Sequence, residues 1–286
     1  MLIGETLTTL RCGNQLLDLS FPVVAGIINV TPDSFYSASR VLETGQNPVE
    51  LAVQMVREGA RIIDIGGMSS RPGAIEVSLN EELDRVLPVI QNVAIRLPDT
   101  VISVDTYRSE VAEAAIRAGA TMINDISGGE MDIKMKDVLS RYPVSYVLMH
   151  MRGRPYDMQT LTVYQDLIGD LLKFFVNKLR ELHRLNIRDI IIDPGFGFSK
   201  TPLQNYHVID QLRVFKMLGK PLMVGISRKS TLSHTIGRPS EETLDATTAL
   251  HMVSLLNGAN ILRTHDVKPA MDAIAVYNKL QEYKNH

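Results

Sequence analysis

Short apolar runs rich in β-branched residues alternate with amphipathic stretches along most of the chain. Each apolar run ends in a polar or glycine-rich turn, and a stretch with helical periodicity follows before the next run begins. Eight runs fit this pattern: Val23–Asn29, Arg61–Ile65, Val101–Val104, Met122–Asn124, Ser145–Met149, Ile190–Asp193, Pro221–Gly225 and Ile261–Arg263. Because the runs are continuously apolar, they predict parallel strands that are buried on both faces.

The stretches between the runs carry helix signals, such as Pro48 at a first helical position and Gly119 at a helix end. They predict helices over Pro48–Glu58, Asn80–Arg96, Ser109–Ala118, Val163–Leu185, Glu241–Leu256 and Val267–Tyr283. Ahead of them, Leu7–Leu19 predicts a hairpin around Gly13–Asn14. The pattern favours a (β/α)₈ TIM barrel whose bottom is capped by this short N-terminal hairpin, with an open doubly wound sheet as the alternative. No linker divides the chain, so we expect residues 1–286 to form a single domain.

Polar residues stand at the C-terminal end of nearly every predicted strand. They include Asn29, Asp64, Asp105, Asn124, His150, Asp193, Lys229, Arg263 and His265. A single residue of this kind is often only a helix cap. Helix caps do not require several cationic side chains around one opening, and in a barrel these strand ends meet at the mouth where catalysis takes place. We therefore expect an active site at the mouth.

Composition narrows the class of protein. The formal net charge of −2, with no basic stripe, argues against nucleic acid as the main partner. The single cysteine, Cys12, excludes an internal disulfide framework and a cysteine-rich metal site. No apolar run approaches the roughly 20 residues needed to cross a bilayer, and the first residues do not resemble a signal peptide. We expect a cytoplasmic protein that does not bind membranes.

The polar residues of the expected mouth divide by charge. Arg71, Lys229, Arg263 and His265 are cationic or can become so, and turns at Gly66–Gly67 and Gly128–Gly129 offer backbone N–H groups. These features suit an anionic, phosphorylated ligand. Asp105, Asn124 and Asp193 form a second set, and carboxylate and amide groups suit the edge of a guanidine-like heterocycle. One ligand that carries both a polar heterocycle and a phosphate would satisfy both sets.

Three residues allow more than one interpretation. Asn29 and Asp33 fit Mg²⁺, which needs few protein oxygens when phosphates are present, although Asp33 equally fits a turn. Lys229 fits either a Schiff-base nucleophile or, as we favour beside Arg228, a hydrogen-bonding and charge role. His150 lies between two methionines, so a packing role is favoured over contact with a ligand.

Seven motifs, in this order along the chain, resemble the signatures of dihydropteroate synthases: Asn29–Phe35, Gly66–Gly73, Ser103–Tyr107, Asn124–Gly129, Asp193–Phe198, Ser227–Ser230 and Arg263–Val267. Each motif alone is weakly specific, but the ordered set covers almost the whole chain. The resemblance implies a barrel that is usually a homodimer. It also implies a Mg²⁺-assisted reaction in folate biosynthesis. In that reaction 6-hydroxymethyl-7,8-dihydropterin diphosphate and 4-aminobenzoate give 7,8-dihydropteroate and diphosphate, and sulfonamides are expected inhibitors.

The resemblance also implies the roles of individual residues, carried over by motif. The pterin is expected to be bound by Asp105, Asn124, Asp193 and Lys229, with Arg263 stacked on it and Phe198 lining the pocket. The diphosphate and the metal are expected to be held by Arg263, His265 and Asn29. The aminobenzoate side is expected to be formed by Phe35, Ser70, Arg71, Pro72 and Ser230. The expected catalytic set is Asp105, Lys229, Arg263 and His265. Asp105 is expected to stabilise the cation that develops as diphosphate departs.

The chain departs from the family pattern in its first two loops. Met68 stands where the family usually has glutamate, Ser70 replaces threonine, and Tyr36–Ser39 replaces Ser-Asp-Gly-Gly. Three other functions stay open: a pterin-binding methyltransferase module, a lysine-based aldolase that uses Lys229, and an inactive pterin-binding or scaffold protein. The predicted phosphate-binding residues Arg263, His265 and Asn29 argue against the methyltransferase module.

Overall fold

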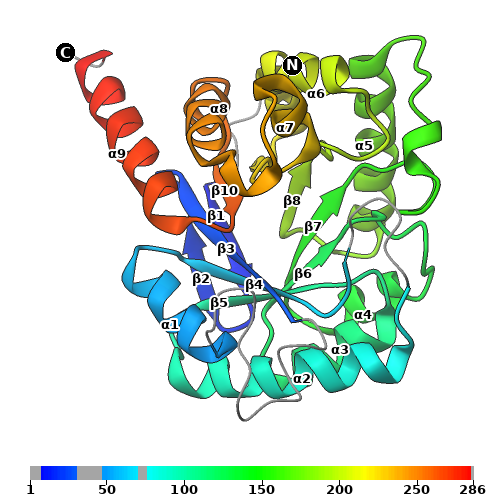
Figure 1. The fold of residues 1–286 in the computed structure, drawn as a ribbon. Helices are drawn as coiled ribbons and strands as arrows, with labels where there is room; N and C mark the ends of the chain where they lie inside the picture. The colour runs from blue at the N-terminus through cyan, green and yellow to red at the C-terminus, as the bar shows by residue number, and fades with distance from the viewer. Residues whose placement is uncertain (1–7, 31–46, 70–75, 285–286) are drawn as a thin grey trace.

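A closed parallel barrel forms the centre of the computed structural model, which describes residues 8–30, 47–69 and 76–284 (Figure 1). Its strands are β3 (Val23–Asn29), β4 (Ile62–Gly66), β5 (Val101–Asp105), β6 (Met122–Asp125), β7 (Ser145–Met149), β8 (Ile190–Asp193), β9 (Met223–Val224) and β10 (Ile261–Thr264). Hydrogen bonds join them in the order β8-β7-β6-β5-β4-β3-β10-β9. The Ile192 N–H then donates to Pro221 O at 2.9 Å, so β8 meets the start of β9. This contact closes the barrel, confirms the predicted fold and excludes the open sheet.

Helices surround the barrel. They are α1 (Pro48–Arg57), α2 (Leu79–Arg96), α3 (Ser109–Ala118), α4 (Met135–Arg141), α5 (Leu167–Arg184), α6 (Pro202–Asp210), α7 (Ser230–Ile236), α8 (Leu244–Leu256) and α9 (Val267–Lys284), with 3₁₀ turns η2 (Met158–Thr160), η3 (Leu212–Leu218) and η4 (Ser240–Glu242). All six predicted helices are confirmed. The predicted helix Val163–Leu185 begins later because the Asp166 side chain caps it at Gly169 N. None of these helices is both long and apolar enough to span a membrane.

The predicted N-terminal hairpin is confirmed within the described residues. β1 (Thr9–Cys12) pairs antiparallel with β2 (Gln15–Asp18), and Gly13 turns between them with φ near +64°. The buried side chains of Leu10, Cys12, Leu17 and Leu19 pack on the lowest interior residues of the barrel. This contact shields the lower core from water and leaves the opposite end of the strands as the open mouth.

Side chains alternate along each strand between the outer core and the barrel interior. In β4, for example, Ile63 and Ile65 pack outward against the helices, whereas Ile62 belongs to the interior cluster below the mouth. Both faces are therefore buried, which explains why the sequence shows continuous apolar runs. The same alternation decides which polar residue near each strand end points inward.

Candidate active site at the barrel mouth

One interior layer of the barrel is polar. Ile62, Met122, Ile191 and Ile261 lie inside on four alternate strands, and all four belong to the lower apolar cluster. Two residues later on the same strands stand Asp64, Asn124, Asp193 and Arg263. Alternate strands of a (β/α)₈ barrel contribute the four side chains of one layer. The layer directly above an apolar one is therefore made of three acidic or amide side chains and one guanidinium.

Arg263 is the centre of this layer. Its Nε donates to Asp64 Oδ2 at 2.6 Å, and its Nη2 donates to Asp105 Oδ2 at 2.6 Å. Asn124 Nδ2 also donates to Asp64 Oδ2, at 3.1 Å. Asp64 is 2% exposed, and its other oxygen has no hydrogen-bond partner among the described residues. The network fixes the guanidinium across the barrel and leaves the Asn124 carboxamide oxygen for another partner.

Burial changes the protonation of the charged groups at the mouth. It raises the pKa of the Asp105 carboxyl to about 7, against the opposing charge of Arg263. Burial and the charge of Arg263 lower the pKa of Lys229 to about 7. Burial alone would also lower the pKa of Arg263, but Asp64 and Asp105 together raise it above its usual value. Arg263 is therefore a permanent cation, whereas Asp105 and Lys229 can change charge near neutral pH.

Lys229 and Asp193 form the opposite side of the pocket. The Lys229 ammonium lies 3.9 Å from the centre of the Phe198 ring, a cation–π contact. Asp193 Oδ1 accepts a hydrogen bond of 2.7 Å from the Gly195 N–H. Burial raises the pKa of Asp193, while the Gly195 N–H and the Lys229 charge oppose that rise.

Gly225 provides space between Asp193 and Arg263. A Cβ atom added there would lie 3.7 Å from Arg263 Cδ and 4.0 Å from Asp193 Oδ2, which is ordinary contact. A side chain at this position would thus occupy the pocket without a clash. The absence of a side chain at Gly225 thus leaves room between Arg263 Cδ and Asp193 Oδ2.

A second group of polar residues joins β3 to β10 at the rim. The Asn29 and His265 side chains approach at 3.5 Å between Nδ2 and Nε2. The other ring nitrogen of His265, Nδ1, lies 3.0 Å from the Ser227 hydroxyl. Arg228, which has a left-handed φ of 56°, pairs with both carboxylate oxygens of Asp266. These contacts tie the ends of β3, β9 and β10 together beside the Arg263 layer.

The predicted site residues have different outcomes. The structure brings together at the mouth Asp105, Asn124, Asp193, Phe198, Lys229 and Arg263, with Asn29 and His265 at its rim. Ser230 is the exposed first residue of α7, next to Lys229. Phe35, Ser70, Arg71 and Pro72 lie outside the described residues, as does Asp33. Sequence reasoning noted Asp64 as a polar residue near a strand end and Ser227 within a motif but assigned neither a role in the site, although Asp64 is the only polar side chain of β4.

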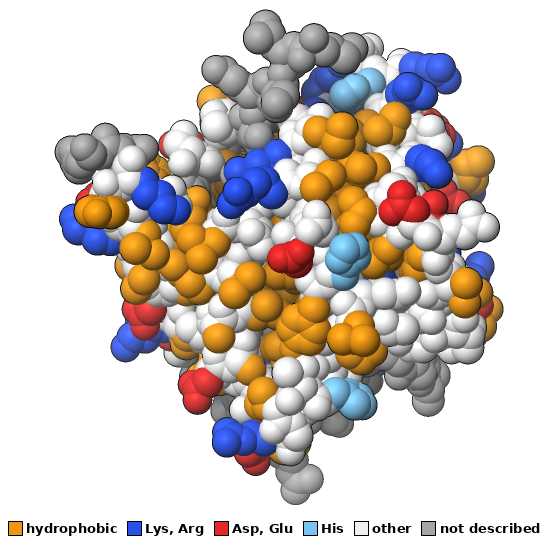
Figure 2. Space-filling model, turned by 90° about the horizontal axis from the view of Figure 1, so that it is seen from above, with side chains coloured by type: hydrophobic (Ala, Val, Ile, Leu, Met, Phe, Trp, Pro, Cys, Tyr) orange, Lys and Arg blue, Asp and Glu red, His pale blue; other side chains and the backbone are white. Residues whose placement is uncertain are grey.

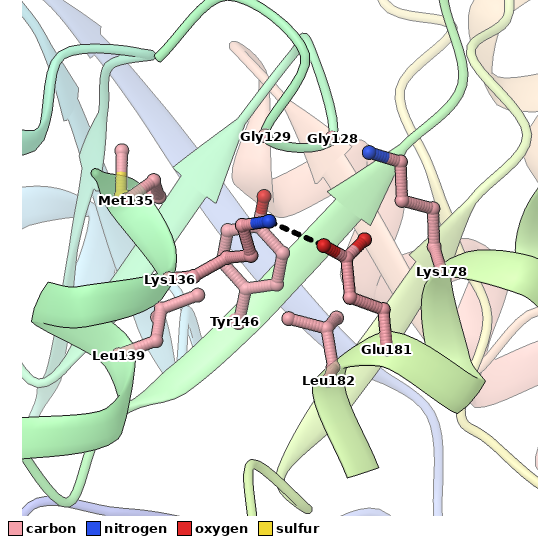
Figure 3. A pocket seen from close by; sticks show the side chains of 9 residues that line it. All are labelled: Gly128, Gly129, Met135, Lys136, Leu139, Tyr146, Lys178, Glu181 and Leu182. Carbon is pink, nitrogen blue, oxygen red and sulfur yellow. Dashed lines mark hydrogen bonds and ion pairs between the residues drawn. The ribbon is translucent and has the colours of Figure 1, made fainter. Parts of the chain in front are cut away.

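The interpretation that Gly128 and Gly129 offer backbone N–H groups to an anion is wrong. The Gly128 N–H donates to Asp125 O and the Gly129 N–H to Asp125 Oδ2, so the turn uses both groups itself. Asp125 points outward, because it follows the inward-facing Asn124, and it also accepts from the Tyr146 hydroxyl. The two glycines border a small cavity between α4 and α5, where Lys136 pairs with Glu181 (Figure 3).

The base of the second loop has an acidic group close to the substituted position. The Tyr107 hydroxyl lies 3.9 Å from Met68 Sδ and donates to a carboxylate oxygen of Glu76. Arg108 pairs with Glu76 and with the buried Glu82. Glu76 thus provides a negative charge next to Met68, where the family signature carries glutamate.

The described residues contain no cluster of three or more histidine, cysteine or acidic side chains able to hold a metal ion. At the rim, the Asn29 carboxamide and the Ser227 hydroxyl lie beside His265. This small donor set does not suit a resident metal. It fits Mg²⁺ that arrives with a phosphate-bearing ligand, because such an ion keeps several waters and needs one or two protein oxygens.

Comparison with known proteins agrees with this geometry. Residues 25–265 match the family described as "Pterin binding enzyme". A dihydropteroate synthase of Synechocystis is 44% identical over 86% of this chain and 85% of its own length, and that of Escherichia coli is 39% identical over 91% and 92%. A structure of the Yersinia pestis dihydropteroate synthase with a sulfonamide drug superimposes with a TM-score of 0.88 at 36% identity, covering 96% of this chain and 99% of the other. The Xanthomonas albilineans enzyme with 4-aminobenzoic acid gives 0.87 at 36% identity, with the same coverage.

Proposed function

The chain belongs to the dihydropteroate synthases of the pterin-binding enzyme family, and from that premise we propose how its barrel mouth joins the two substrates. The enzyme condenses 6-hydroxymethyl-7,8-dihydropterin diphosphate with 4-aminobenzoate to give 7,8-dihydropteroate and diphosphate, a step of folate biosynthesis. The observation that carries the assignment of residues is the polar layer of Asp64, Asn124, Asp193 and Arg263.

The pterin ring is held between Asp193 and Lys229 above Gly225. The ring edge presents an amino group and an N–H, which a carboxylate accepts, and a carbonyl oxygen, to which an ammonium donates. Asp193 Oδ2 and the Lys229 ammonium face the space beside Gly225 and Phe198. The Asn124 carboxamide oxygen and Asp105 complete the polar contacts. The Arg263 guanidinium, held in place by Asp64 and Asp105, would stack on the ring.

The diphosphate lies at the rim beside Asn29 and His265. Asn29 is placed at the end of β3 and His265 just after β10, and Arg263 on the same strand brings positive charge. Asn29 would hold Mg²⁺ that arrives on the diphosphate, where the ion neutralises charge on the leaving group when bound. His265 donates to a phosphate oxygen, and Ser227 fixes the orientation of its ring.

The reaction breaks the C–O bond to the diphosphate and forms a C–N bond from the aminobenzoate nitrogen to the pterin methylene. Positive charge develops on that methylene as the diphosphate leaves with the bonding electron pair. The ionised Asp105 carboxylate stabilises this charge, an electrostatic contribution that requires no rearrangement during the reaction. The amine nitrogen is already a free base and attacks with its lone pair, and the excess proton it then carries passes to the departing diphosphate or to water.

The aminobenzoate side is proposed to consist of Ser230 with Phe35, Ser70, Arg71 and Pro72, of which only Ser230 lies within the described residues. Ser230 follows Lys229 directly, so the two substrates would meet above Lys229. The carboxylate of aminobenzoate is matched by Arg71, since guanidinium groups bind carboxylates through two parallel hydrogen bonds.

We further propose a cytoplasmic homodimer. Exposed apolar side chains gather on neighbouring helices, with Leu203 in α6, Met217 in η3 and Val253 and Leu256 in α8. Figure 2 looks down on the side of the molecule where α6 and α8 lie and shows hydrophobic side chains spread across it. A patch of this kind on a soluble protein favours a protein partner, and a second copy of the chain is the simplest one. The cytoplasmic location is supported by the substrate, whose diphosphate does not pass a bilayer unaided.

One experiment tests the function directly. Purified protein is incubated with Mg²⁺ and the pterin diphosphate, with and without 4-aminobenzoate, and released diphosphate and dihydropteroate are measured. We expect release of diphosphate and dihydropteroate in equal amounts that depends on 4-aminobenzoate. Binding of the pterin without any turnover would instead favour an inactive pterin-binding protein. Borohydride trapping of a carbonyl substrate on Lys229 would favour an aldolase.

A further inference from the structure

Lys200 is a buried lysine without an acidic partner. It is 2% exposed, and no carboxylate of the described residues lies within ion-pair distance of its ammonium. Three groups surround the ammonium: Gly195 O at 3.0 Å, Phe198 O at 3.1 Å and His150 Nδ1 at 3.2 Å. The three N–H groups of the ammonium are thus matched by three neutral acceptors. Burial lowers the pKa of Lys200 to about 7, against the opposing charge of Asp193, so keeping this amine in the interior is costly and a role beyond packing is expected.

The surroundings of His150 make its ring the third hydrogen-bond acceptor of the Lys200 ammonium. Its ring packs edge-on against Phe174, with centroids 5.0 Å apart, and it lies beside Tyr164. Burial and the charge of Lys200 hold the pKa of His150 well below its usual value, so the ring is neutral and Nδ1 accepts. His150 therefore lies behind the pocket wall, which supports its interpretation as a structural residue.

The two carbonyl groups belong to the segment that leaves β8. Gly195 has φ +73°, Gly197 +84° and Ser199 +46°, so three residues of a five-residue stretch adopt left-handed backbone. At Gly195 a Cβ would lie only 2.0 Å from His150 O, which excludes any other residue. Such a backbone persists only where its surroundings enforce it. The ammonium of Lys200 binds the segment at both ends, Gly195 and Phe198.

This segment places two groups of the proposed pterin pocket. Gly195 donates its N–H to Asp193 Oδ1, which turns Oδ2 toward the space beside Gly225. Phe198 lies with its ring 3.9 Å from the Lys229 ammonium. A loss of the Lys200 contacts would therefore release both the ring and the orientation of the carboxylate. Ser230, the one described residue proposed for the aminobenzoate side, is not among the groups that Lys200 contacts.

We propose that Lys200 is a positioning residue for the pterin half of the site, which holds the Gly195–Phe198 carbonyls so that Phe198 and Asp193 keep their places beside Lys229. It touches neither substrate. The inference rests on the proposed function for the identity of the ring, but the anchoring itself predicts a defect in ring binding that is measurable without turnover.

The test compares Lys200→Met with Lys220→Met. Lys220 is also largely buried and donates to a backbone carbonyl, Arg188 O at 2.7 Å, but it precedes β9 and lies at the end of the barrel away from the mouth. For both variants and the wild type we would measure melting temperature, KM for each substrate, and binding of 6-hydroxymethylpterin by calorimetry. We expect Lys200→Met to raise the pterin Kd and the pterin diphosphate KM by about tenfold, with the aminobenzoate KM within about twofold. Lys220→Met should lower the melting temperature similarly and leave both KM values unchanged.

A double-mutant cycle with Phe198→Leu tests the route of the effect. If Lys200 acts through Phe198, the two substitutions together should raise the pterin Kd by clearly less than the product of their separate factors. An unchanged pterin Kd in folded Lys200→Met, equal changes in both KM values, or full multiplicativity of the two factors would overturn the proposal. If Lys200→Met does not fold, His150→Gln serves instead, because it changes only the contact between the Lys200 ammonium and His150 Nδ1. An unchanged pterin Kd in that variant would count against the proposal. A wild type that binds the pterin without turnover would end the proposed function but not this inference.

Discussion

Asp64→Asn separates the structural from the electrostatic role of the polar layer. Asp64 accepts hydrogen bonds from Arg263 Nε at 2.6 Å and Asn124 Nδ2 at 3.1 Å, and it is not among the residues proposed to contact either substrate. Asparagine keeps the shape and one acceptor oxygen but removes the negative charge. The substitution therefore tests how much the buried carboxylate contributes through its charge alone.

The expected cost in stability follows from the contacts. A hydrogen bond to a charged group contributes about 1.5–3 kcal/mol, whereas a buried charge left without any partner costs about 3–5 kcal/mol. Arg263 keeps Asp105 as a partner at 2.6 Å, so the lower range applies. We expect a loss of about 2 kcal/mol in the free energy of unfolding, or a fall of about 4–8 °C in the melting temperature.

The electrostatic effect has a definite sign. The Asp64 charge is one of the causes that raise the pKa of Asp105 to about 7, and Arg263 opposes them. Without Asp64, one repelling charge disappears and the guanidinium is left to Asp105 alone. Both changes lower the pKa of Asp105. If the ionised carboxylate is the active form, the acid limb of kcat/KM, which reports the free enzyme, moves to lower pH.

The assay is a pH profile of kcat/KM for the pterin diphosphate, with a thermal melt of each variant. Asp84→Asn is the matched control, because Asp84 is an exposed residue of α2 and should change neither quantity. An acid limb that stays in place or moves to higher pH in Asp64→Asn would refute the reasoning, even if the protein is destabilised as expected.

Three further predictions concern the pocket and the surface. Gly225→Ala should raise the KM for the pterin diphosphate about tenfold, because the added Cβ occupies the proposed pocket. It should change the free energy of unfolding by only about 0.5 kcal/mol, because that Cβ meets no atom closer than 3.7 Å. Steady-state kinetics and a thermal melt check both, and an unchanged KM would contradict the prediction. Asp105→Asn should lower kcat by about 10²–10³-fold in steady-state assays, and turnover near that of the wild type would exclude its proposed role. Val253→Glu should convert the dimer to monomers in light scattering, whereas Val276→Glu on α9, which is similarly exposed, should not; a Val253→Glu dimer would place the interface elsewhere.

The sequence predicted the barrel well because its strands are buried on both faces. Such strands require continuous apolar runs, and three of the eight predicted runs match the strand bounds, including Val23–Asn29. Short helices were harder to predict. α4 and α7 have seven residues each, too few for a clear 3.6-residue period, and α6 was missed although Thr201 and Gln204 form a capping box.

The site was predicted in outline but not in its connections. The polar strand ends indicated the mouth. Which of two adjacent polar residues, such as Asn124 and Asp125, points into the barrel depends on how side chains alternate along the strand. Asp64 was noted at a strand end but given no role, because its partner Arg263 lies 199 residues away in the sequence. Lys200 was missed because its acceptors are backbone carbonyls and a histidine 50 residues away. Contacts of that kind depend on the closed barrel and have no local pattern.

The polar layer of Asp64, Asn124, Asp193 and Arg263 reflects ligand binding and not the packing of the barrel. Packing alone favours an apolar side chain at both interior levels, because burying paired charges often gains no more than burying hydrophobic residues of similar size. Four strands follow this preference at the lower level, where they carry Ile62, Met122, Ile191 and Ile261. Two residues later, all four carry a polar or charged side chain instead. The change occurs on alternate strands, the ones that share a layer. A stability requirement gives no reason for that coincidence, whereas a single ligand that needs an acceptor, an amide and a guanidinium at one height does.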